Sequence, residues 1–133
     1  LTDLIALSLA AKQAHWNVVG PSFKPVHEHL DALRGELDEY VDEVAERMVA
    51  LSISPNGQVS DVAAITRDDL LPRGWIQDGD VVRLMASALY NTNLHVRELM
   101  ATIEDIDTVT ADMMHAVVAG LEKQLWMFRA QVR

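Results

Sequence analysis

The chain has 133 residues, enough for one domain with a sizeable core and too few for a typical two-domain enzyme. It contains no cysteine, which excludes disulfides, thiolate metal sites and cysteine nucleophiles, so any metal must be held by its 5 histidines and its 20 aspartates and glutamates. The net charge of −9 disfavours contact with nucleic-acid phosphates and favours cations, and no run of about 18 apolar residues predicts a membrane span.

The first half of the chain shows the apolar spacing of two amphipathic helices. Apolar residues recur at alternating steps of three and four, which turns one face of each helix toward a core. This pattern predicts helices near residues 2–18 and 25–52, with Gly20-Pro21 as the break between them.

The second half predicts two more helices, near residues 79–104 and 110–131. The connection before them begins at Pro55-Asn56-Gly57, carries a predicted short helix over residues 60–65, and contains a segment, residues 72–75, that resists regular structure. No alternation typical of strands is visible. Short links and one long crossover predict an all-α four-helix bundle. The crossover, with its short helix, lies between helices two and three, so that the middle two helices run parallel.

The second predicted helix carries potential metal ligands on one face. His27, Asp31, Asp42 and Glu46 follow one another at spacings of 4, 11 and 4, which places all four within roughly 100° around the helix. Asp31 and Asp42 lie about 16 Å apart along the axis, too far to share one ion. The stripe therefore forms two half-sites, or is a solvated polar face. If a second copy packs antiparallel about a two-fold axis between the half-sites, where Gly35 permits close approach, each half-site meets the other kind.

His15 adds a second imidazole to this pattern. The turn between the first two helices centres on residue 21, so His15, six residues before it, and His27, six after it, are expected to face each other. One site would then gather two imidazoles and up to three carboxylates. Nitrogen and oxygen ligands of this kind suit iron, manganese or zinc.

These residues resemble the sequence pattern of the Dps family, the miniferritins named for DNA protection in starved cells. The match is strongest over residues 12–51 and continues, more weakly, to Trp126. It rests on the following residues: His15-Trp16-Asn17, Gly20, Phe23, His27, Asp31, Asp42 and Ala45-Glu46-Arg47.

The resemblance implies a ferritin-like four-helix subunit that assembles into a hollow dodecamer with metal centres at its two-fold interfaces. The implied ligands are His15, His27 and Asp31 from one subunit, with Asp42 and Glu46 from its neighbour. The Glu-x-x-His motif of ordinary ferritins has no match in the sequence.

The activity that the resemblance implies is oxidation of Fe²⁺ to Fe³⁺ by hydrogen peroxide or dioxygen, at mononuclear or dinuclear sites, with ferric mineral stored in the cavity and DNA thereby protected from oxidative damage. Zinc or manganese could occupy the same site. Trp16 resembles the family's tryptophan beside the centre, which can donate one electron; the alternative is an aromatic packed at the end of the bundle.

Acidic residues near the junction of the last two helices have two interpretations. The resemblance implies that Asp107 and Asp112 line a negatively charged pore that admits iron. Alternatively, these carboxylates cap the last helix and stabilise its dipole. Both can hold at once.

Further charged residues have less specific interpretations. Carboxylates on the second helix could nucleate mineral or form a solvated face: Glu36, Glu39 and Glu43. The remaining histidines are expected at the surface or at an interface: His29, His95 and His115.

Two other functions stay open at this point. One is a nucleoid-compacting protein that binds DNA through basic tails outside this sequence, and the other is a helical interaction module whose polar stripe is simply solvated. Residues 1–133 are expected to be a single domain, with tails beyond them. With no export signal in view, the expected location is a bacterial cytoplasm, in association with the nucleoid if DNA is bound.

Overall fold

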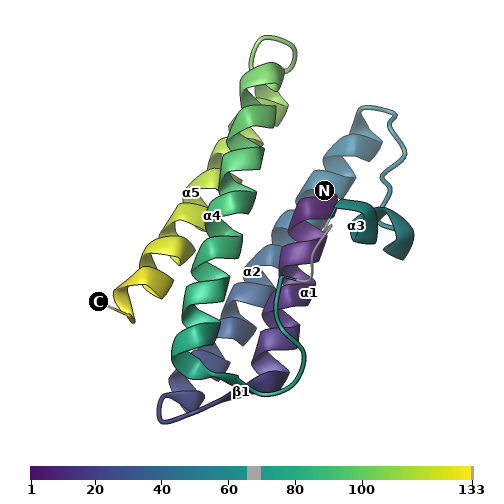
Figure 1. Cartoon of the computed structure of the whole chain (residues 1–133). Helices are drawn as coiled ribbons and strands as arrows, with labels where there is room; N and C mark the ends of the chain where they lie inside the picture. The colour runs from purple at the N-terminus through teal and green to yellow at the C-terminus, as the bar shows by residue number, and fades with distance from the viewer. Residues whose placement is uncertain (66–69, 133) are drawn as a thin grey trace.

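The computed structural model describes residues 1–65 and 70–132, and four long helices account for most of them (Figure 1). Helix α1 spans Thr2–Asn17, α2 Phe23–Ala50, α4 Asp78–Ile103 and α5 Thr108–Ala130. These bounds agree with the predicted ranges to within two residues at each end. The chain is therefore all-α in its main architecture, as the apolar spacing predicted.

The four helices form two antiparallel hairpins. Helix α1 packs mainly against α2, and α4 mainly against α5. The crossover returns the chain to the end of the bundle where α2 began, so that α2 and α4 run in the same direction (Figure 1). This confirms the predicted topology, a four-helix bundle with one long connection.

The crossover carries the short helix α3, Val59–Ile65, which packs against α1. The last residues of the crossover form a strand that the sequence did not predict. This strand, β2, Ile76–Gln77, runs parallel to β1, Val18–Val19, which follows α1. Each strand has two residues, too few to show the alternation by which strands are recognised. The pair fixes the end of the crossover, just before α4, beside the link between α1 and α2.

A tight corner next to these strands depends on Gly20. Its φ of 134° lies in a region that favours glycine, and a Cβ there would lie 2.6 Å from the Asp78 carboxyl carbon. That carboxylate accepts hydrogen bonds from the backbone nitrogens of Ser22 and Gly79. Asp78 thereby ties the turn between α1 and α2 to the first turn of α4.

Leucine and phenylalanine fill the interior of the bundle. The largest buried side chains come from all four long helices: Leu4, Leu7, Leu30, Leu33, Leu37, Met85, Leu89, Leu121 and Phe128. The apolar spacing also continues to Leu51, Leu99 and Val132, but these three are exposed. Leu51 and Val132 follow the last residues of α2 and α5, and Leu99 lies four residues before the end of α4. Among the described residues, no helix is both long enough and apolar enough to cross a bilayer.

Candidate metal centre

Two histidine rings stack where α1 ends and α2 begins. The ring centroids of His15 and His27 lie 3.6 Å apart with an interplanar angle of 21°. Each Nδ1 is 2.9 Å from the backbone carbonyl oxygen of the other histidine. A carbonyl oxygen only accepts, so each Nδ1 donates its proton and each Nε2 keeps a lone pair. Both imidazoles are thus held in the tautomer that can bind a metal through Nε2.

Asp31 lies beside this pair, but its carboxylate is engaged by a lysine. Asp31 Oδ1 is 2.6 Å from Lys12 Nζ and 3.9 Å from His15 Nδ1. The hydrogen bond from Lys12 lowers the pKa of Asp31 below its usual value. Sequence reasoning missed Lys12, although it lies three residues before His15 and so on a neighbouring part of the same helix face.

Asp42 and Glu46 lie further along α2, and both are exposed. Helical periodicity puts them on the face that carries His27 and Asp31, yet Asp42 follows Asp31 by eleven residues and so lies too far along the helix to share one ion with it. Among the described residues, no three histidine, aspartate or glutamate side chains come close enough to hold a metal ion. One chain therefore holds the predicted ligands in two separate groups, as their spacing on the helix requires.

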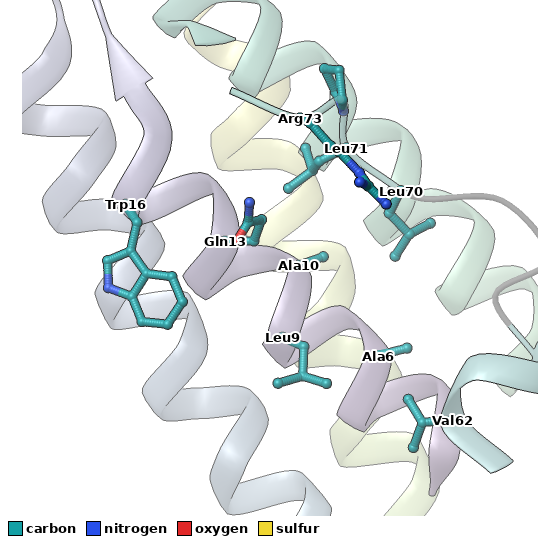
Figure 2. Close-up of a pocket in the computed structure, with 10 residues that line it drawn as sticks. Ala6, Leu9, Ala10, Gln13, Trp16, Val62, Leu70, Leu71 and Arg73 are labelled. Carbon is teal, nitrogen blue, oxygen red and sulfur yellow. The ribbon is translucent and has the colours of Figure 1, made fainter. Parts of the chain in front are cut away.

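Trp16 follows His15 directly, and most of its side chain is exposed to solvent. Its side chain is 63% exposed, so within one chain it is not the packed aromatic that the alternative interpretation expected. It borders a groove of about 400 Å³ between α1 and the crossover (Figure 2). The groove is lined mainly by apolar residues, among them Leu9 and Ala10 of α1 and Leu70 and Leu71 of the crossover.

Asp107 has a structural role at the start of α5. It is the N-cap residue and accepts a hydrogen bond from the backbone nitrogen of Val109. Its Oδ2 also accepts a hydrogen bond from the Thr110 hydroxyl and lies 2.6 Å from Arg47 Nη2 on α2. These hydrogen bonds lower the pKa of Asp107 to about 2, and the bond from Thr110 has a larger effect than the bond from Arg47.

The capping interpretation is therefore confirmed for Asp107, and the pore remains a prediction. Asp112 is exposed on α5, one turn beyond the cap. Its carboxylate has no ion-pair partner among the described residues, so it is the freer of the two predicted pore carboxylates.

Of the three remaining histidines, His29 was placed wrongly. It is half-buried, its ring stacks on Phe128 with centroids 4.2 Å apart, and its Nε2 lies 2.9 Å from the Gln124 side-chain oxygen. It joins α2 to α5 inside one chain. His95 and His115 are exposed, as expected.

The predicted mineral-nucleating carboxylates gather around a tyrosine on α2. Glu39 and Glu43 are exposed and Glu36 is half-buried. Burial, followed by the charges of these three residues, raises the pKa of Tyr40. The side chains thus form an acidic face, and the structure assigns it no ligand.

Comparison with known proteins gives a consistent result over the whole chain. A family model described as a ferritin-like domain matches residues 1–133. The DNA protection during starvation protein of Mycolicibacterium smegmatis is 38% identical over 133 residues, which cover 95% of this chain and 69% of that protein. The fine tangled pili major subunit of Haemophilus ducreyi is 35% identical over 133 residues, which cover 99% and 70%.

Solved structures show the same similarity in three dimensions. The structure of Dps from Microbacterium arborescens in the high iron form superimposes with a TM-score of 0.94 at 29% identity. The alignment covers 98% of this chain and 86% of that one. The fold is thus shared along nearly the whole of this chain.

Proposed function

This chain belongs to the ferritin-like family, in its Dps group, and we propose on that basis that it oxidises Fe²⁺ to Fe³⁺ at a site shared between two copies of the chain. The oxidant is hydrogen peroxide or dioxygen, and the ferric product is stored inside a hollow assembly of twelve copies. Removing iron and peroxide together protects DNA from oxidative damage.

The stacked histidines are the observation that carries this proposal. Their mutual hydrogen bonds leave both Nε2 atoms as ready acceptors, a state that metal-binding imidazoles require. Asp31 supplies a carboxylate next to them, and a second copy would supply Asp42 and Glu46. Such mixed nitrogen and oxygen ligands suit iron, and they also accept zinc or manganese.

Oxidation of Fe²⁺ by peroxide requires of the protein mainly these metal ligands. Hydrogen peroxide takes up two electrons and two protons to give two waters, so one molecule oxidises two Fe²⁺ ions. The carboxylates stabilise the higher charge of Fe³⁺, and the imidazoles hold the ion in place. Trp16, exposed beside His15, would supply one electron when a single iron is present.

The proposal also covers the route by which Fe²⁺ enters the assembly and the location of the assembly in the cell. Asp112, together with Asp107, would line an acidic pore through which Fe²⁺ enters, although Asp107 is already paired with Arg47. The assembly would lie in a bacterial cytoplasm.

The test is anaerobic loading of the assembled protein with Fe²⁺, followed by a peroxide pulse while ferric absorbance and particle mass are recorded. Paired substitutions at His27→Gln with Asp31→Asn, or at Asp42→Asn with Glu46→Gln, should each abolish rapid oxidation and leave the particle mass unchanged. His95→Gln removes an exposed histidine far along the chain and should oxidise iron normally. Normal oxidation in either paired variant would exclude the assigned ligands.

A second function, DNA binding, is favoured by the names of the relatives, which are DNA protection during starvation proteins. The acidic charge of these 133 residues opposes direct contact with a duplex, so binding would depend on basic tails outside this sequence. Electrophoretic mobility shift of DNA at physiological salt, with and without such tails, tests this function. A nucleoid-compacting protein shifts DNA only when the tails are present.

A further inference from the structure

No contact within one chain explains why residue 35 is a glycine. It lies in the interior of α2, exposed, and a Cβ at this position would meet nothing within 4 Å. Glycine is a poorer helix former than alanine, so a glycine in open space weakens the helix without any compensating contact in the chain. The remaining physical reason for it is close approach by another molecule.

An ion pair beside Gly35 is only partly satisfied. Arg34 Nε lies 3.3 Å from Asp38 Oδ2, and Asp38 Oδ1 is 2.5 Å from the hydroxyl of Ser8, which is buried on α1. Arg34 Nε is itself buried and makes no hydrogen bond of good geometry. The other guanidinium nitrogens have no acceptor among residues 1–65 and 70–132. Arg34 therefore has donors to spare, and Asp38 is held in place by Ser8.

The shared site fixes where a second copy would lie on this face. Antiparallel packing that brings Asp31 level with Asp42 of the second copy also brings Gly35 level with its Asp38. The two-fold axis then passes between residues 36 and 37. The Arg34 and Asp38 side chains of both copies fall within about one helical turn of one another, around the two glycines.

We propose that Arg34 and Asp38 form a four-charge cluster with Asp38 and Arg34 of the second copy, and that this cluster sets the register of the two α2 helices. The proposal rests on the shared site of the proposed function. Arg34 and Asp38 are positioning residues, because they touch no metal and act by aligning the half-sites that do.

Charge explains why the cluster selects one register. A slip of one turn in one direction places Asp38 level with Asp31 of the second copy, and in the other direction level with Glu39. Both alternatives bring like charges together at the centre of the contact, which disfavours them. In the aligned register each Asp38 meets an arginine instead.

Mixing two charge-reversal variants tests the cluster directly. Arg34→Glu alone gives four acidic groups at the axis, and Asp38→Arg alone gives four basic ones. Each should raise the concentration needed for half-maximal assembly at least about tenfold, measured by sedimentation velocity at low salt. An equimolar mixture should return to within about threefold of wild type, because acid and base then meet only across the contact. No intrahelical pair can form in either variant, so recovery identifies pairing between copies.

The matched control is the exposed ion pair of Arg83 and Asp80 on α4. Arg83→Glu and Asp80→Arg should leave assembly unchanged, separately or mixed. If a reversal unfolds the chain, Arg34→Gln and Asp38→Asn replace it, and their mixture restores one of the two interchain pairs.

Unchanged assembly of the single variants, or no recovery on mixing, overturns the cluster. If wild type still oxidises iron in that case, the proposed function stands without it. If mixing restores assembly but wild type oxidises no iron, the contact stands and the proposed function falls.

Discussion

His15 and His27 show how far single residues could be predicted from the sequence. Their equal distance from the turn predicted that they would face each other, and the rings stack at 3.6 Å. The hydrogen bonds that set their tautomers could not be predicted, because they depend on the orientation of each ring and each carbonyl. Lys12 could not be assigned for the same reason: its contact with Asp31 depends on the rotation of α1 against α2.

If Asp31 is a metal ligand, as we propose, Lys12 competes with the metal for its carboxylate. Lys12→Met removes the ammonium group, so the pKa of Asp31 returns toward its usual value and the carboxylate becomes free to bind an ion. We expect the assembled protein to bind Zn²⁺, a redox-inert probe, roughly three- to tenfold more tightly by calorimetry at neutral pH. Lys24→Met removes the exposed ion pair between Lys24 and Glu28 on α2 and should change the Zn²⁺ affinity little. Unchanged or weaker Zn²⁺ binding in Lys12→Met would show that the lysine is not a competitor.

Asp107 makes stability depend on pH in the acid range. Its pKa in the folded chain is about 2, below its ordinary value of 3.8. The stabilisation is therefore complete above the ordinary pKa and disappears as the pH falls through the folded pKa. Asp107→Asn keeps a capping side chain but loses the charge that pairs with Arg47. Its melting temperature should be lower than wild type at pH 6, and the difference should shrink as the pH falls and vanish below about pH 2. A difference that stays constant with pH would assign the effect to packing.

Among the elements, the four long helices and the long crossover with its short helix followed from apolar spacing and breaker residues, and the strand pair did not. The bounds of α2 and α4 could be predicted because glycine and proline mark their ends. Strands β1 and β2 could not, since two-residue strands pair only because the crossover brings distant segments together. His29 was misplaced because its partners, Gln124 and Phe128, lie on a helix nearly a hundred residues away.

The contact between α2 and α5 depends on Gly120. A Cβ there would lie 2.0 Å from the Tyr40 hydroxyl oxygen and 2.8 Å from its ring carbon. Gly120→Ala gains about 1 kcal/mol of helix propensity but forces the tyrosine to move, at a cost of about 1–3 kcal/mol. We expect a lower melting temperature by circular dichroism, with recovery in the double variant Gly120→Ala, Tyr40→Leu. A single variant as stable as wild type would mean that α2 and α5 adjust freely here.

For the whole molecule, the spacing of ligands on α2 had already excluded one ion held by both Asp31 and Asp42 of the same chain. Among its described residues, the structure likewise brings no three potential ligands close enough to hold an ion. In the proposed function a second copy completes the site, so neither a sequence nor a single chain can display the finished geometry. In our further proposal the charges around Gly35 align that second copy.

Complementation between two inactive variants tests whether each site takes ligands from two chains. One variant carries His27→Gln with Asp31→Asn, and the other carries Asp42→Asn with Glu46→Gln. Each alone should be inactive in peroxide-driven Fe²⁺ oxidation. When the two are unfolded together and reassembled, half of the pairs are mixed and each mixed pair contains one intact site, so about a quarter of the wild-type rate should return. No recovery, in a mixture whose mixed assembly is verified by native mass spectrometry, would contradict a site shared between chains.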